Sequence, residues 1–200
     1  MAQINGVLFD AGGVLVALDG VPSLARLLGV EPSHDDLHRR WMSCASVRLY
    51  ETGKISADNF AAAVIGELGL ALSPEAFLLE FNGWLTGPLP GAFELVARIP
   101  NRYRVGILSN MSALHWQRIV SMAPLERFDT ICVSHEIGFL KPSNQAFLTA
   151  LSRMALSPGK VLFLDDGAAN VDAARELGLK AHVVESPVQA ERVLTEHGVL

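Results

Sequence analysis

Residues 4–15 read INGVLFDAGGVL, and this stretch decides how the chain folds. Residues 7–9 form an unbroken apolar run, which is typical of a parallel strand buried on both faces. Asp10 would then stand at the carboxyl end of that strand, where open α/β sheets place their ligand sites. Gly12 and Gly13 lack a Cβ atom, so the backbone after Asp10 can turn sharply and approach a ligand closely. An ordinary turn can carry the same pattern, so its meaning depends on the rest of the chain.

Length and composition exclude several classes of partner. The 200 residues suit one domain, or a core domain with a small insert, and 50% of them are hydrophobic. The balance of 16 Lys and Arg against 21 Asp and Glu gives a net charge of −5, which argues against nucleic acid as a partner. No apolar run reaches membrane-spanning length, the start lacks the basic residues of a signal peptide, and 2 cysteines are too few for a disulfide framework. We therefore expect a cytoplasmic protein with no membrane partner; the sequence does not indicate its oligomeric state.

Three consecutive helices interrupt an otherwise alternating chain. Apolar residues at helical spacing predict a helix over 34–50, a second from Ser56 to Gly69, and a third that opens at Ser73. The turn-rich residues 87–91 close this part. The sequence therefore predicts a small helical domain at residues 19–86, inserted in a core domain made of residues 1–18 and 87–200.

Strands and helices alternate through the rest of the chain. Strands are predicted over 103–108, 130–133, 161–164 and 180–184, and helices over 91–99, 112–121, 143–154 and 187–197. Strands separated by helices predict an α/β fold with a doubly wound parallel sheet and right-handed connections.

Polar residues follow three of the predicted strands: Asp10, then Ser109 with Asn110, then Asp165 with Asp166. Because the carboxyl ends of parallel strands lie at one edge of a sheet, we expect these groups to meet in one crevice. Neighbouring carboxylates repel one another unless a cation joins them, and Mg²⁺ is the simplest cation for a cluster of oxygens. Lys141 and the Ser109 hydroxyl are then available to hold phosphate oxygens.

These motifs resemble those of the haloacid dehalogenase (HAD) superfamily, most closely its phosphatase branch with a helical cap. The matching segments are Phe9-Asp10-Ala11-Gly12-Gly13-Val14, Leu108-Ser109-Asn110, Lys141-Pro142, and Leu164-Asp165-Asp166 with Asn170. They occur in the order typical of that family, and the helical insert lies between the first two, where its caps are placed. The resemblance covers nearly the whole chain and implies a Rossmann-like core.

The resemblance also implies roles for individual residues. Asp10 would be the nucleophile that becomes an aspartyl phosphate, a covalent route that divides one hard displacement into two steps. The implied phosphate ligands are Ser109, the Asn110 backbone amide and Lys141. The implied ligands of Mg²⁺ are Asp10, the Gly12 carbonyl and Asp166, with Asp165 as a further candidate and Asn170 as a supporting group. Tyr50, Glu51 and Lys54 flank a bend of the cap that would face the crevice, and are candidates for substrate specificity.

One position departs from the phosphatase pattern. The residue two after the nucleophile is normally an aspartate that protonates the leaving group, and here it is Gly12, as in some sugar-phosphate phosphatases that the chain resembles. Asp19 and His115 are candidate substitutes. General acid–base catalysis typically contributes about 10²–10⁴-fold, so we expect activity to favour leaving groups that need little protonation. The spacing of Trp41, Phe60, Phe77 and Phe81 predicts packing within the cap.

The expected function is therefore a magnesium-dependent phosphatase that acts on a small phosphorylated metabolite, such as a sugar phosphate. Two alternatives stay open. Gly12 allows a non-catalytic or weakly active protein that only binds the phosphometabolite. The second alternative is a 2-haloacid dehalogenase in which Asp10 attacks carbon without a metal, although the pair Asp165 and Asp166 argues against a metal-free anion site.

Overall fold

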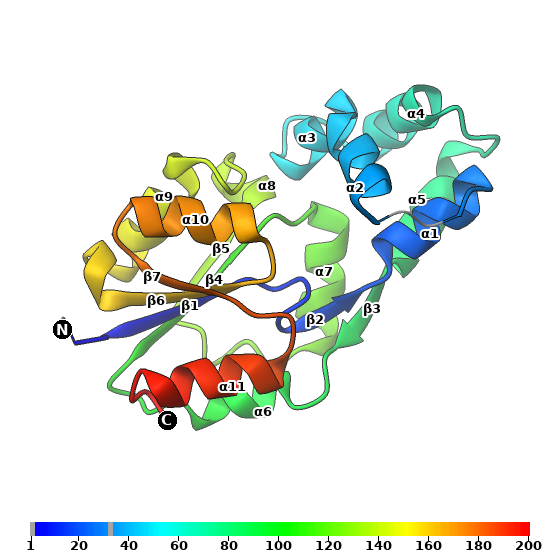
Figure 1. Ribbon diagram of the computed structural model, residues 1–200. Helices are drawn as coiled ribbons and strands as arrows, with labels where there is room; N and C mark the ends of the chain where they lie inside the picture. Colours follow the sequence, from blue (N-terminus) through cyan, green and yellow to red (C-terminus); the bar gives the residue numbers. More distant parts are fainter. Residues whose placement is uncertain (1–2, 32–33) are drawn as a thin grey trace.

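A five-stranded parallel sheet forms the centre of the protein, in a computed structural model that describes residues 3–31 and 34–200 (Figure 1). The strand order is β5-β4-β1-β6-β7, with the bounds Gly6–Phe9 for β1, Arg104–Ser109 for β4, Thr130–Val133 for β5, Val161–Asp165 for β6 and Lys180–Val183 for β7. Every neighbouring pair is parallel. The predicted doubly wound sheet is thus confirmed. Because the order reverses at β1, a crevice forms outside the carboxyl ends of the central strands.

Helices cover both faces of this sheet (Figure 1). On one face lie α6 (Ala92–Arg98), α7 (Ala113–Met122) and α11 (Pro187–Glu196), and on the other lie α9 (Asn144–Met154) and α10 (Ala168–Glu176). The short α8 (Ser134–Ile137) follows β5, and a 3-10 turn, η1 (Pro158–Lys160), precedes β6. Within the ranges described, no helix is both long and apolar enough to cross a membrane.

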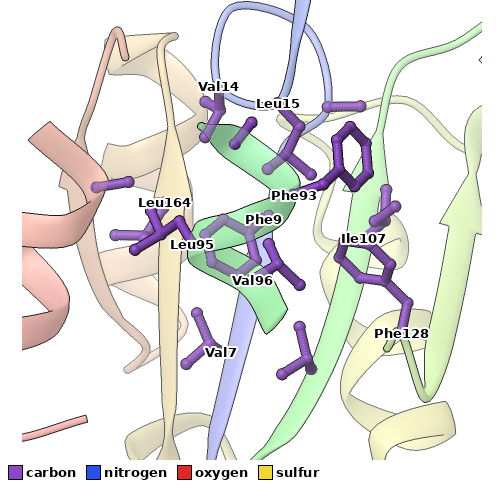
Figure 2. Close-up of a cluster of buried hydrophobic side chains, with 14 of the residues drawn as sticks. Val7, Phe9, Val14, Leu15, Phe93, Leu95, Val96, Ile107, Phe128 and Leu164 are labelled. Carbon is purple, nitrogen blue, oxygen red and sulfur yellow. The ribbon is translucent and has the colours of Figure 1, made fainter. Parts of the chain in front are cut away.

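The residues of β1 explain why its apolar run does not alternate with polar residues. Val7 and Phe9 point into the hydrophobic core beneath α6, α7 and α11, whereas Leu8 points into the core beneath α9 and α10. All three side chains are fully buried. Figure 2 shows Phe9 among the side chains of α6 and the neighbouring strands. Both cores thus fix the strand that ends directly before Asp10.

The helices α1–α5 lie together, away from the sheet (Figure 1). Their bounds are Gly20–Leu28, His34–Ser43, Ala45–Glu51, Ala57–Leu68 and Pro74–Gly83. They enclose a separate hydrophobic cluster that includes Phe60, Phe77 and Phe81. The antiparallel strands β2 (Val16–Leu18) and β3 (Leu85–Pro88) connect this group to the core. The division at residues 19 and 86 remains a prediction that is consistent with this arrangement.

The structure corrects three sequence-based expectations in this region. The single helix predicted over 34–50 is two helices, α2 and α3, separated at Cys44, which has extended backbone angles. Helix α1 was not predicted, and neither were β2 and β3. These strands have three and four residues, and β3 contains Gly87 and Pro88, which are uncommon in strands. Their pairing joins distant parts of the chain, so no local pattern indicates it.

Replacing the buried ring next to Asp10 tests how strongly the core holds β1. We expect Phe9→Ala to lower the free energy of unfolding by about 3–5 kcal/mol, because a fully buried phenyl group leaves a cavity. Leu79→Ala is the control, since Leu79 is 78% exposed, and it should change stability by less than about 0.5 kcal/mol. Urea denaturation measures both variants. Equal effects of the two substitutions would contradict this account of the core.

Candidate active site

A cavity of about 590 Å³ opens at the carboxyl ends of β1, β4 and β6. The residues that follow β1, β4 and β6, together with the loop before α9 and the first turn of α10, supply polar lining at this end: Asp10, Ser109, Asn110, Lys141, Asp166 and Asn170. The structure thus brings together polar residues that lie far apart in the sequence. Helices α1–α3 and α5 supply part of the opposite wall, so a ligand in this cavity would lie between the helical group and the core.

Lys141 lies between two carboxylates. Its Nζ atom is 2.9 Å from Asp10 Oδ1 and 2.5 Å from Asp165 Oδ2, and only 1% of the lysine side chain is exposed. The Ala11 backbone N–H also donates to Asp10 Oδ1, at 2.7 Å. These contacts fix the orientation of the Asp10 carboxylate at the end of β1.

The Asn110 side chain holds the backbone of Lys141. Its Oδ1 atom accepts a hydrogen bond from the Lys141 N–H at 2.8 Å, and its Nδ2 atom donates to the Lys141 carbonyl at 3.0 Å. The next residue, Met111, is held in turn by Ser134 of α8, whose hydroxyl accepts from the Met111 N–H at 2.9 Å. The sequence indicated Asn110 only as a phosphate ligand through its backbone amide. The two hydrogen bonds from its side chain to the Lys141 backbone show that Asn110 also positions the lysine.

Burial and neighbouring charges shift the titration of these groups. Burial raises the pKa of Asp10, and Asp165 and Asp166 raise it further, while Lys141 opposes the shift. Burial and Asp165 likewise raise the pKa of Asp166. Burial by itself would lower the pKa of Lys141, but Asp10 and Asp165 outweigh it and raise that pKa. One lysine therefore only partly offsets the negative charge that three carboxylates can carry.

The three carboxylates form a candidate metal site. Asp10, Asp165 and Asp166 each offer an oxygen within 4.8 Å of those of the other two. Both oxygens of Asp165 are already engaged, because Oδ2 contacts Lys141 and Oδ1 accepts from the Gly167 N–H at 2.8 Å and from Asn170 Nδ2 at 2.9 Å. The Asp166 residue is exposed and lines the cavity.

Gly13 allows Asp166 to approach the loop after β1. It has φ +70°, and a Cβ atom at this position would overlap the Asp166 carboxylate. Gly12 has no such conformational constraint, but a Cβ atom there would come within 2.7 Å of Leu18 Cδ1. Leu18 therefore occupies the space into which an acid at position 12 would project.

The two candidate substitutes for that acid have other partners. Asp19 lies at the start of α1, pairs with Arg26 at 3.3 Å, and is not among the described residues that line the cavity. His115 lines the cavity, but its Nε2 atom is 2.7 Å from the Phe81 carbonyl, so that nitrogen carries the proton and donates it there. Burial lowers the pKa of His115, which favours the neutral ring. His115 thus connects α7 to α5.

The specificity candidates of the cap lie in different places. Glu51 lines the cavity. Tyr50 is buried and stacks on Phe60, with ring centroids 4.4 Å apart, and Lys54 is exposed. Neither Tyr50 nor Lys54 belongs to the described lining of the cavity. The sequence predicted that the bend flanked by these residues faces the crevice, but it did not predict where each side chain points.

The aromatic residues of the cap have two environments. As predicted, they pack on one another, and Phe60 and Phe77 are fully buried. Trp41 and Phe81 also line the cavity, which corrects their interpretation as packing residues alone. Trp84 lines it as well and was not singled out from the sequence; its spacing of three residues from Phe81 was the available signal.

Comparison with known proteins agrees with this architecture. The family model of haloacid dehalogenase-like hydrolases matches residues 4–178, and the chain therefore belongs to that family. It is 24% identical over 201 residues to the D-ribitol-5-phosphate phosphatase of Bacteroides thetaiotaomicron, covering 96% of this chain and 98% of that protein.

Solved structures show the same fold. An HAD-like family hydrolase from Porphyromonas gingivalis superposes with a TM-score of 0.79 and 24% identity over 98% of both chains. An HAD family enzyme from Bacteroides thetaiotaomicron, in complex with magnesium and inorganic phosphate, superposes with a TM-score of 0.74 and 21% identity, covering 90% of this chain and 94% of that one.

Removing the Asn110 side chain tests its role as the support of Lys141. We expect Asn110→Ala to lower the free energy of unfolding by about 1–3 kcal/mol, because the Lys141 N–H and carbonyl lose their partners. Asn101→Ala, in an exposed turn, is the matched control and should leave stability unchanged. Denaturant titration of both variants measures the difference. An Asn110→Ala protein as stable as the control would refute the supporting role.

Proposed function

We propose that this hydrolase is a magnesium-dependent phosphatase that acts on a small phosphorylated metabolite, such as a sugar phosphate. The observation that carries the proposal is the buried contact of Lys141 with Asp10 and Asp165 at the edge of a cavity. A carboxylate next to a fixed cation can attack a phosphorus atom whose oxygens the same cation attracts. The relative that hydrolyses D-ribitol 5-phosphate supports this choice of substrate class.

In the proposed reaction, an Asp10 oxygen bonds to phosphorus while the bond from phosphorus to the ester oxygen breaks, and the leaving oxygen takes a proton from water, so that the alcohol departs. Water then cleaves the aspartyl phosphate, which restores Asp10 and releases inorganic phosphate. Ser109 and the Asn110 backbone amide bind phosphoryl oxygens, and Lys141 offsets their charge. The Ala11 N–H and Lys141 hold the Asp10 carboxylate in place for the attack. The helical group, proposed as a cap over residues 19–86, limits the access of water.

The residues at this site fit a divalent cation. Three carboxylates meet, and Lys141 is the one buried lysine that contacts them among the described residues, which leaves a negative, oxygen-rich site. We assign Asp10, Asp166 and the Gly12 carbonyl as the ligands of Mg²⁺, and Asp165 as the residue that positions Lys141, because both Asp165 oxygens are engaged. When bound, Mg²⁺ would offset the charge of the phosphate and of the nucleophile. The magnesium and phosphate complex of the structurally similar enzyme supports Mg²⁺ as the cation.

A cytoplasmic location is part of the proposal. Cys44 and Cys132 are both free and buried. Thiols in this state suit a reducing compartment, where disulfides are rare.

Replacing the nucleophile tests the reaction. We expect the native chain to release phosphate from phosphorylated metabolites with Mg²⁺ and not with EDTA, and Asp10→Asn to lower kcat by at least about 10³-fold, because the amide is a poor nucleophile. Asp172→Asn, whose side chain is 67% exposed, is the control and should keep the native rate. A phosphate-release assay over a metabolite panel measures all three proteins. Binding of the metabolites without any phosphate release by the native chain would instead select the non-catalytic alternative, and turnover of a 2-haloacid in EDTA would select the dehalogenase.

Restoring an acid at position 12 tests the consequence of Gly12. We expect the native chain to hydrolyse aryl phosphates faster than alkyl phosphates, because aryl leaving groups need little protonation. Gly12→Asp combined with Leu18→Ala, which clears the space, should raise kcat on alkyl phosphates by about 10-fold or more. Leu18→Ala by itself is the control and should give no such increase. Equal native rates on aryl and alkyl phosphates would contradict this explanation.

A further inference from the structure

Glu51 is the last residue of α3, and one oxygen of its carboxyl group is buried without a hydrogen-bond partner among the described residues. The side chain lines the cavity, and Oε2 is buried with no hydrogen bond to any residue within the ranges described. Burial raises the pKa of Glu51 to about 7. A buried carboxyl oxygen without a partner costs free energy, so a ligand group that bonds to it gains from the pairing.

The end of α3 is fixed against the core. Gly53, two residues after Glu51, has φ +69°, and a Cβ atom there would overlap the carbonyl of His135 in α8. On the other side of Glu51, the buried Tyr50 ring stacks on Phe60. Glu51 therefore stands at the junction between the helical group and the core, on an element whose position is held from both sides.

The lining of the same cavity also combines apolar ring faces with a second unpartnered group. Trp84 Nε1 is buried and has no hydrogen-bond partner in the part of the chain that the structure describes. Trp84, Trp41 and Phe81 line the cavity, and the Trp41 ring centroid is 5.0 Å from that of Trp84 and 5.8 Å from that of Phe81. Such a wall matches a ligand that presents C–H groups together with hydroxyls, because hydroxyls both donate and accept hydrogen bonds.

The charged residues of the cavity lining further restrict the chemical class of the ligand. Among the described residues that line the cavity, Lys141 is the one Lys or Arg, and it is engaged with Asp10 and Asp165. Beyond the phosphate site, no Lys or Arg of this lining is thus available to pair with a second anionic group, and the Glu51 carboxyl would disfavour one.

We propose that Glu51 is a specificity-determining residue that hydrogen-bonds a hydroxyl of the substrate, which is a phosphate monoester of a neutral, polyhydroxylated molecule. This inference rests on the proposed function for the phosphate end of the ligand. It assigns the aromatic wall to the carbon chain and Trp84 Nε1 to a second hydroxyl oxygen.

Binding to a protein without turnover tests this assignment. Calorimetry on Asp10→Asn with Mg²⁺ compares a five-carbon alditol phosphate with pentyl phosphate, which has the same chain length and no hydroxyls. We expect the alditol phosphate to bind more tightly. Adding Glu51→Leu should weaken the affinity for the alditol phosphate by about 10- to 100-fold, because one hydrogen bond to a carboxyl group is lost. The affinity for pentyl phosphate should change by less than about threefold. Glu51→Gln should retain part of the preference.

Two controls separate recognition from structural damage. Glu176→Leu, on the exposed surface of α10, should change neither affinity. Glu51→Leu should unfold at no lower denaturant concentration than the parent, since it removes an unpartnered buried group. Equal weakening of both ligands by Glu51→Leu, or equal affinity of the parent for both, would overturn the inference.

Failure of this inference can be told apart from failure of the proposed phosphatase function. A native chain that binds the alditol phosphate through Glu51 yet releases no phosphate upholds this inference and refutes the phosphatase. A native chain that hydrolyses pentyl phosphate as readily as the alditol phosphate upholds the phosphatase and refutes this inference.

Discussion

The contact of Lys141 with Asp10 and Asp165 is the constraint on which the site depends. A buried ammonium group is stable only when carboxylates pair with it, and removing one partner from such an arrangement typically costs about 3–5 kcal/mol. Asp10 follows β1 directly, Asp165 ends β6, and Lys141 lies in the loop before α9, so the contact forms only when β1 and β6 lie side by side and this loop reaches them. Asn110, at the end of β4, then holds the lysine backbone. The packing that buries Phe9 therefore also positions Asp10 in the cavity.

The two adjacent carboxylates of this site, Asp165 and Asp166, have different surroundings. Asp165 is fully buried and accepts from three donors, whereas Asp166, its neighbour, is exposed at the cavity and approaches Gly13. The adjacent carboxylates therefore differ in what they can bind. This difference supports the proposed division of labour, in which one positions the lysine and the other takes a cation.

The helical group contributes stability and shape through the same side chains. Trp41, Phe81 and Trp84 belong to an aromatic cluster that packs α1–α5, and the same rings form part of the cavity wall. His115 extends this cluster to α7, since its ring stacks on Phe81 at 4.2 Å and bonds to the Phe81 carbonyl. A change in cap packing would therefore alter the cavity as well.

The sequence by itself determined the parallel sheet, the order of the motifs and the meeting of Asp10, Ser109 and Asp166 at one edge, because apolar runs and strand ends are local features. Lys141 lies in a loop, and the resemblance to the family indicated its place. Only the tertiary structure decided that β2 pairs with β3, that Leu18 covers the space beside Gly12, and that Glu51 lines the cavity while Tyr50 is buried. The physical reason is that these features depend on contacts between segments distant in the chain, whose geometry is set by packing and leaves no periodic signal in the residues themselves.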